Sequence, residues 1–230
     1  MASPDLTKFE VRQAELIYSA TLDPPAFDFP ARWIDMEAAM YTRFSTYKLR
    51  LPDIKVESTS NNPGDFCIAC WVYALGAVVR YRLDRLEIVS NSPKLAADET
   101  MASDFVQQAL DVLRAASSDP RVVLHSLTVA LHGTLLGETQ AAKLAAYVTR
   151  APQGEPALTP NGVSFGSKLP SGDSRGSIVF ESSLVVPEGA FVKVTSEHSG
   201  ALSEREAVAR GADFFRIATT RIGFDICWEK

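Results

Sequence analysis

Residues 177–196 hold the pattern that most restricts the fold of this chain, because two alternating stretches flank one short turn. Apolar residues fall on one face, at Ile178, Phe180, Leu184 and Val186 before the turn and at Val192 and Val194 after it. Side chains alternate between the two faces of a β-strand, so this period predicts two strands. Pro187, Glu188 and Gly189 between them are typical turn residues. The sequence therefore predicts an antiparallel hairpin over residues 177–196.

Further strands are predicted from the same alternation. Tyr47, Leu49 and Leu51 alternate with basic residues. The stretch Phe66–Val89 is too long for one ordinary strand, and Gly76 inside it indicates a tight hairpin or a bulged, bent strand. Additional strands are predicted over Val79–Leu83, Arg121–Gly133 and Phe224–Trp228.

Four segments are predicted to be helical. Ala31–Phe44 and Asp98–Ala116 repeat apolar residues at near-helical spacing, and Thr139–Thr149 is rich in alanine. The last helix has the clearest boundaries. It begins at Ser203, with Glu206 three residues later as a capping box, and it ends at Gly223.

Short connections between strands, together with long amphipathic helices, predict an α+β fold with antiparallel sheet(s) and the helices packed on one face. The order of elements also fits a doubled layout, in which strands are twice followed by a long helix. Prolines at 152, 156 and 160 mark residues 151–162 as an extended connection. We expect residues 1–150 to hold a sheet with helices, and residues 163–230 the hairpin and last helix, packed together as one compact unit.

Charge and hydropathy exclude several classes of protein. The chain has 230 residues and a formal net charge of −5, which disfavours wholesale binding of nucleic acid. Its longest uncharged stretches, Phe66–Val79 and Val122–Gly137, are shorter than the roughly 20 apolar residues of a membrane-spanning helix. The N-terminus does not resemble a signal peptide, and three cysteines do not form a disulfide framework. We expect a soluble, cytoplasmic protein without membrane contact.

Two short motifs match catalytic or metal-binding patterns but lack the necessary setting. Residues 172–176 read G-D-S-R-G and match the G-x-S-x-G turn of α/β-hydrolases, in which a helix must follow the serine. A predicted strand follows Ser174, so we interpret the motif as a polar hairpin loop. Cys67 and Cys70 form one C-x-x-C on a predicted strand, where residues three apart point to opposite faces. No second pair completes a zinc site, so we predict buried thiols, no metal and no cofactor.

The three histidines are predicted to lie in different environments. His125 shares the apolar face of the strand over 121–133, whereas His132 falls on the other face, so the two cannot bind one metal. We expect His125 to be a core or rim residue. His198 lies between Glu197 and Ser199 and is predicted to be a solvent-exposed loop residue.

Four basic residues are the candidate binding residues. Lys48 and Arg50 share one face of a predicted strand, and Arg80 and Arg82 share one face of another. If the two strands are neighbours, these cations line one sheet face and form a patch for RNA, a phosphorylated ligand or an acidic partner. The alternative interpretation is a solvated face whose charges are balanced by nearby carboxylates.

No motif identifies an activity, and three hypotheses follow. The first is a non-catalytic binding or assembly protein that recruits a protein partner, or a second copy, at sheet edges such as Phe224–Trp228, in one version as a chaperone-like binder of an extended segment. The second is a hydrolase or transferase whose site combines His125 or His198 with carboxylates. The third is binding of RNA or a phospholigand at Lys48, Arg50, Arg80 and Arg82.

Overall fold

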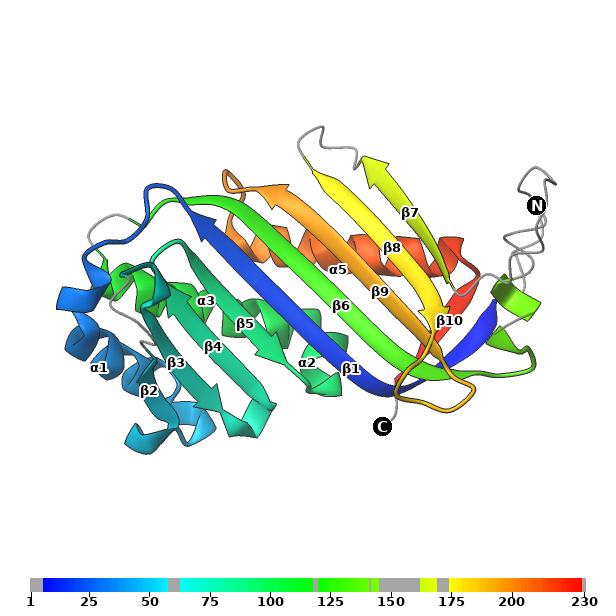
Figure 1. Cartoon of the computed structure of the whole chain (residues 1–230), viewed down its shortest axis with the longest axis horizontal. Helices are drawn as coiled ribbons and strands as arrows, with labels where there is room; N and C mark the ends of the chain where they lie inside the picture. Colours follow the sequence, from blue (N-terminus) through cyan, green and yellow to red (C-terminus); the bar gives the residue numbers. More distant parts are fainter. Residues whose placement is uncertain are drawn as a thin grey trace.

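The computed structural model describes residues 6–57, 63–117, 120–140, 142–144, 162–168 and 174–228. Its strands are β1 (Thr7–Leu22), β2 (Ile54–Glu57), β3 (Cys67–Val72), β4 (Ala77–Arg82), β5 (Arg85–Ser90), β6 (Val122–Leu135), β7 (Gly162–Lys168), β8 (Arg175–Ser182), β9 (Ala190–Ser199) and β10 (Phe224–Cys227). They form one ten-stranded sheet in the order β2-β3-β4-β5-β1-β6-β9-β8-β7 (Figure 1). All neighbours in this order are antiparallel, and β10 lies off it, parallel to the start of β1.

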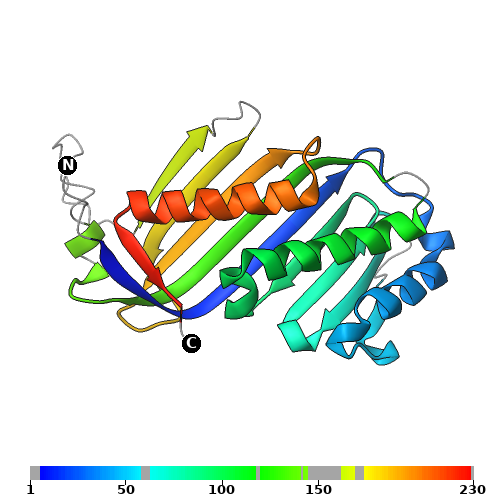
Figure 2. The same cartoon turned by 180° about the vertical axis from the view of Figure 1, so that it is seen from behind.

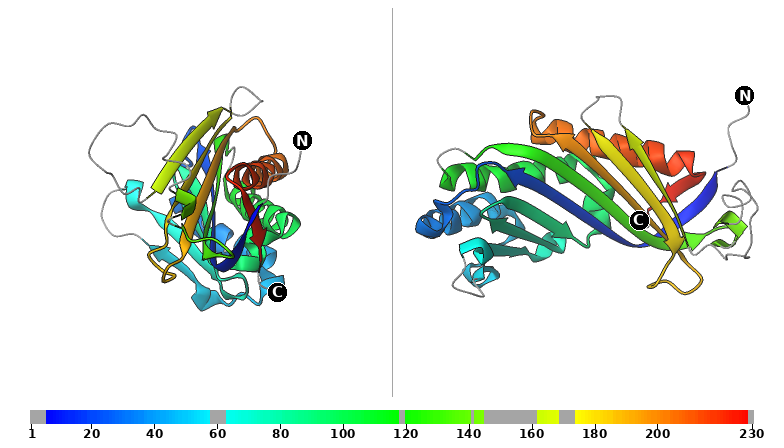
Figure 3. Two further views of the ribbon diagram at one scale, coloured as in Figure 1. Left: turned by 90° about the vertical axis from the view of Figure 1, so that its right-hand side faces the viewer. Right: turned by 45° about the horizontal axis from the view of Figure 1, so that its top comes forward.

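Four helices in the described part of the chain cover one face of this sheet. They are α1 (Trp33–Arg43), α2 (Pro93–Ala97), α3 (Glu99–Ala116) and α5 (Glu204–Arg221). The two longest, α3 and α5, lie across the same face (Figure 2), and an end-on view places both on one side of the sheet (Figure 3). Figure 1 looks onto the opposite face, on which none of these four helices lies. The predicted fold class, α+β with long helices on one face of an antiparallel sheet, is confirmed.

The layout is doubled about the central pair β1 and β6. On one side of this pair lie β5, β4 and β3, and on the other β9, β8 and β7. Along the chain, β1–β5 are followed by α3 and β6–β9 by α5, and each of these helices has 18 residues. The doubled sheet-then-helix layout is therefore present.

The strands before and after residues 151–162 belong to the same sheet. β6 pairs with β9 from Leu124↔Ser199 to Gly133↔Ala190. Residues 151–161 lie outside the described residues, and the division at 151–162 stays a prediction.

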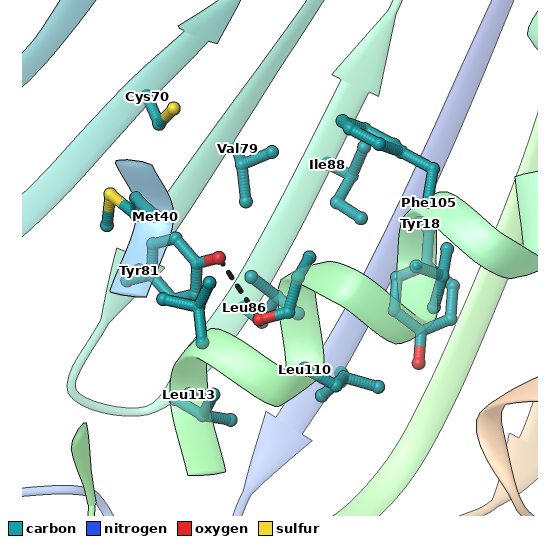
Figure 4. Close-up of a cluster of buried hydrophobic side chains, with 14 of the residues drawn as sticks. Tyr18, Met40, Cys70, Val79, Tyr81, Leu86, Ile88, Phe105, Leu110 and Leu113 are labelled. Atoms are coloured by element: carbon teal, nitrogen blue, oxygen red, sulfur yellow. Dashed lines mark hydrogen bonds between the residues drawn. The ribbon is translucent and has the colours of Figure 1, made fainter. Parts of the chain in front are cut away.

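Two hydrophobic clusters fill the space between the sheet and the helices. The larger one gathers around α1, α3 and strands β1–β5, and the other gathers around α5 and β6, β8 and β9. Figure 4 shows the larger cluster, in which the buried Tyr81 hydroxyl donates to the carbonyl of Ala109 at 3.0 Å. Each fully buried large apolar side chain stabilises the fold by about 1.5–3 kcal/mol. Burial on the helix side thus determines which face of the sheet is left to solvent.

The predicted helix boundaries agree with the capping contacts. The Asp98 side chain accepts a hydrogen bond from the Met101 N–H at 3.0 Å and begins α3. Ser203 and Glu206 form the predicted reciprocal capping box at the start of α5. Gly223 follows α5 with a φ of 76°, a conformation that glycine adopts without strain. Of the predicted helix 139–149, residues 140 and 142–144 are helical, and the rest, apart from Thr139, lies outside the described residues.

The predicted hairpin is present as β8 and β9. Gly189 donates its N–H to the carbonyl of Val186 at 2.9 Å, which closes the turn. β8 ends at Ser182, however, so Leu184 does not share the apolar face with Phe180 and is 98 % exposed. The long stretch 66–89 is divided into β3, β4 and β5, and Gly76 lies in the turn between the first two, with a φ of 51°.

The predicted strand around residues 47–51 is wrong. These residues lie in two 3-10 turns, Ser45–Tyr47 and Leu51–Asp53, separated by an irregular link. Lys48 has a left-handed backbone, with a φ of 59°, and this conformation interrupts a strand. Asp53 accepts hydrogen bonds from the backbone and the guanidinium of Arg50, and this contact holds the second turn.

Candidate functional site: the open face of the sheet

The face opposite the helices, called the open face below, is formed by the strand residues that alternate with the buried ones. Across the first half it carries Lys55, Glu57, Cys67, Ala69, Trp71, Val78, Arg80, Arg82, Arg85, Glu87 and Val89. Across the centre and the second half it carries Gln13, Glu15, Ile17, Ser19, Thr21, Leu124, Ser126, Thr128, Ala130, His132, Phe191, Lys193, Thr195, Glu197, Arg175, Ser177, Val179 and Glu181.

Strand register arranges these side chains in rows that run across the sheet. One row is apolar in the first half, with Trp71, Val78, Val89 and Ile17 on successive strands. In the second half the same row carries hydroxyl side chains, and those of Thr128 and Thr195 are hydrogen-bonded to each other at 3.0 Å. Uncharged hydroxyls and apolar side chains therefore occupy the middle of the open face.

Charged side chains of both signs flank this middle. Arg80 forms a salt bridge with Glu87 at 3.5 Å, directly across β4 and β5. The Lys55 ammonium lies 5.1 Å from the ring centre of Trp71, within range of a cation–π interaction. In the second half, Arg175 and Glu197 are register partners on β8 and β9. Because cations and carboxylates are interspersed, the open face as a whole does not suit the binding of a polyanion.

A hollow of about 320 Å³ indents the open face over β1, β6 and β9. Among its lining residues are Gln13, Glu15, Ile17, His132, Glu181, Leu184, Phe191 and Lys193. The His132 and Phe191 rings are in contact, with centroids 4.6 Å apart and planes tilted by 35°.

The loop after β8 fixes the tautomer of His132. The Ser183 hydroxyl accepts hydrogen bonds from the N–H groups of Val185 and Val186, so its own proton is directed to His132 Nδ1, 2.9 Å away. Nδ1 of the neutral ring is thus an acceptor, and Nε2 carries the hydrogen. Burial lowers the pKa of His132, while Glu15 and Glu181 partly oppose this shift. The hollow offers a neutral donor and charges of both signs, which suits recognition of polar groups rather than nucleophilic attack.

His125 is buried on the helix side, as predicted, and both of its ring nitrogens are occupied. Its Nε2–H donates to the carbonyl of Leu202 at 3.2 Å, and Nδ1 accepts from the Tyr18 hydroxyl at 2.6 Å. Beside this pair, Arg114 binds Glu204 through two hydrogen bonds of 2.8 and 3.0 Å. These contacts join β1, β6 and the start of α5, and they give His125 a structural role.

The prediction that His198 is a solvent-exposed loop residue is wrong. It is the ninth residue of β9, faces His125 across the strand pair and is 1 % exposed. Its Nδ1 lies 3.1 Å from the Ser174 hydroxyl, so the serine of the G-D-S-R-G motif does meet a histidine. Ser174 is itself buried and is followed by β8 rather than by a helix, so the structural setting of a hydrolase nucleophile is missing.

Of the four predicted binding residues, the structure places two on the open face. Arg80 and Arg82 lie there on β4, as the alternation predicted. Lys48 and Arg50 lie in the 3-10 turns instead, and Arg50 is bound to Asp53, so the predicted four-cation face does not form. Arg85 was not predicted as part of the patch. The two-residue turn Leu83–Asp84 indicates its position, because it places residues 82 and 85 opposite each other.

The two cysteines of the C-x-x-C pair point to opposite faces of β3, as predicted. Cys70 belongs to the larger hydrophobic cluster, and Cys67 pairs in register with Arg82 on the open face. Both thiols are free and buried. Burial raises the pKa of Cys70 to about 12, which keeps this thiol protonated and unreactive.

We expect the free energy of unfolding to fall in mild acid, because two histidines are buried. Burial lowers the pKa of His125 and of His198 below the ordinary value near 6.5, so the unfolded chain binds more protons than the folded one as pH falls past 6.5. Each group contributes a slope of at most about 1.4 kcal/mol per pH unit. Urea unfolding at pH 7.5, 6.0 and 5.0 measures this loss. Glu204 loses its stabilising charge only below about 4.5, because its pKa is lowered by Arg114, so it does not act in this window.

The variant His125→Gln distinguishes the contribution of this histidine from other effects of acid. His125→Gln should be less stable at pH 7.5 but show a smaller change between pH 7.5 and 5.0. An unchanged stability of the unmodified chain over this range would contradict the prediction.

Comparisons with known proteins add little to this description. No protein-family model matches the chain, and no curated protein matches it. Among solved structures, the chain is similar to "Methanococcus jannaschii TBP" with a TM-score of 0.33 and 9 % identity, over 92 % of this chain and 99 % of that one. A similarity at this level carries no argument about function.

Neither a membrane-spanning helix nor a cluster of metal ligands occurs among the described residues. None of the described helices combines the length and apolar character needed to cross a membrane. Among the same residues, no three His, Cys, Asp or Glu side chains gather as a set of metal ligands.

Proposed function

We propose that this chain is a non-catalytic, cytoplasmic binding protein that receives a protein partner on the open face of its sheet. The observation that carries the proposal is the placement of α1, α2, α3 and α5 on one side only. A sheet of this width normally buries one face against helices, and the second face, on which no labelled helix of the described chain lies, offers a surface for recognition. The described cysteines are free, which is usual in a reducing compartment and supports the cytoplasmic location.

The chemistry of the open face favours a protein over a nucleic acid. An apolar row that includes Trp71 and Ile17 lies beside hydroxyl groups, and charges of both signs surround them. Protein interfaces combine an apolar centre with a polar rim in this way. A nucleic acid crossing the same face would meet Glu15, Glu87 and Glu197 as well as the arginines, and carboxylates repel phosphates.

A long charged side chain beside the apolar row of the open face should abolish partner binding. Ser126 lies on the central strand β6 in the row next to Thr128, opposite Ser19 of β1 and Glu197 of β9, so Ser126→Arg adds a long side chain without opening the core. We expect the purified, tagged chain to retain a partner from its own source. The amount of this partner retained by Ser126→Arg should be at least tenfold lower. Quantitative mass spectrometry of the retained proteins measures the loss.

A matched variant on the helix side controls for surface charge. Ile217 of α5 is 51 % exposed, so Ile217→Arg makes a comparable change away from the open face and should leave retention unchanged. Equal losses in both variants would reject the open face as the site. If retention persists in Ser126→Arg but is lost in Ile226→Pro, the partner instead adds to the edge strand β10, as the sequence alone suggested.

A further inference from the structure

Arg82 and Arg85 face each other where β4 and β5 meet. Tyr81 and Leu86 are register partners, so the next position of the same ladder pairs Arg82 with Arg85, next to the two-residue turn. Both side chains belong to the open face, and Arg85 is exposed. Two cations are therefore neighbours at one corner of this face.

The preceding open-face pair on the same strands shows how the sheet neutralises an arginine elsewhere. Arg80 lies opposite Glu87, and their charged groups form a salt bridge at 3.5 Å. Within the described residues, neither Arg82 nor Arg85 forms a salt bridge. Asp84 lies between them in the turn and makes none with either. The two pairs differ in sequence: a carboxylate lies opposite Arg80, whereas a second arginine lies opposite Arg82.

The free protein carries a cost at this corner. Like charges directly opposite each other destabilise a strand pair. In addition, Nε of Arg82 is buried and has no hydrogen-bond partner within the described part of the chain. A buried donor without an acceptor loses its hydration and gains nothing in return. An oxyanion bound between the two guanidinium groups would relieve the repulsion.

We propose that the Arg82–Arg85 pair binds a carboxylate from an acidic segment of the protein partner. Guanidinium groups bind carboxylates through paired, charge-assisted hydrogen bonds. The site is local, because Glu87 lies on β5 two residues from Arg85, and Glu57 lies on β2, across β3 from Arg82. One or two carboxylates therefore fit, and a polyanion does not. This inference rests on the proposed function, since it specifies which chemical group of the partner docks at this corner.

Binding of defined peptides tests the proposal. The probe is a fluorescein-labelled peptide of alternating valine and glutamate, and its counterpart carries glutamine in place of glutamate. In low salt, fluorescence anisotropy should show about tenfold tighter binding of the acidic peptide, and Arg82→Gln or Arg85→Gln should remove this difference. Arg205→Gln is the matched control, because Arg205 lies on α5 and pairs with Asp104. It should keep the difference.

Three results of this experiment would overturn the proposal. They are equal binding of the two peptides, an equal loss in Arg205→Gln, and an oligouridylate that binds more tightly than the acidic peptide. The third would make the corner a nucleic-acid site.

A stability measurement tests the same corner without any ligand. Arg85→Glu copies the Arg80–Glu87 arrangement, so we expect the melting temperature to rise by about 1–3 °C while binding of the acidic peptide is lost. A lower or unchanged melting temperature would show that Arg82 is already neutralised and would overturn the proposal. These outcomes are separate from partner retention in Ser126→Arg. Peptide binding that depends on Arg82, without an effect of Ser126→Arg on retention, would keep the arginine site and reject the proposed function.

Discussion

Phe105→Ala should lower the free energy of unfolding by about 3–5 kcal/mol, among the largest effects expected for a single substitution in this chain. Phe105 is fully buried on α3 in the larger hydrophobic cluster (Figure 4). Its ring centre lies 5.4 Å from that of Phe44 and 5.7 Å from that of Tyr47. The side chain thus connects the helix layer to the segment after α1, and its removal leaves a cavity that neighbouring rings cannot fill. Urea or thermal unfolding measures the change.

The same chemical change at an exposed position is the control. Phe27 is 72 % exposed, so Phe27→Ala should change stability by less than about 0.5 kcal/mol. If the two variants lost similar stability, the packing of Phe105 against the segment after α1 would not have the energetic role inferred here.

Local patterns predicted most helices and many strands because they depend on neighbours in the sequence. The capping box at Ser203 and the alternation of Ile178 with Phe180 are examples, and both are present in the structure. The one-sided helix layer also follows from the sequence, because amphipathic helices must bury their apolar stripe. Which residues then form the open face depends on strand register, and register joins segments that are far apart in the chain.

Three errors have specific physical causes. Tyr47, Leu49 and Leu51 alternate like a strand, but the left-handed backbone of Lys48 interrupts it. His198 was placed in a loop although it is in phase with Val192 and Val194, a signal that extends the strand to residue 199. In the first case the backbone interrupts the alternation, and in the second the alternation continues and correctly indicates a strand.

The third error concerns the longest strand, β1, which was not predicted. Leu16, Tyr18 and Ala20 alternate as in any strand, but the buried residues Val11 and Ala14 are three apart. The register with β6 shifts between Val11 and Gln13, so one extra residue is accommodated in a β-bulge. A bulge breaks the period of two, and so the pattern near the start of the chain did not indicate one continuous strand.

Gly133→Ala should destabilise the protein by about 3 kcal/mol, because this bulge requires a glycine on the neighbouring strand. A Cβ at Gly133 would lie 2.1 Å from the backbone oxygen of Glu10 and 2.5 Å from the Phe9 ring. Backbone cannot move aside as a flexible side chain does, so β1 must shift against β6. Unfolding in urea measures the loss. Gly166→Ala is the matched control, since a Cβ there meets nothing within 4 Å, and its effect should stay within about 0.5 kcal/mol.

The consequence of Gly133→Ala also extends to the open face. Gln13 and His132 are the first register partners after the bulge, and both line the hollow. A shift of β1 would therefore move Gln13 and Glu15 relative to His132, and the NMR resonances of the His132 ring should change in the folded fraction. The His125 ring, which lies seven residues away on β6 and is held by Tyr18, should change less. A stable variant with an unchanged His132 spectrum would contradict the inference that close approach at Gly133 fixes the register of this face.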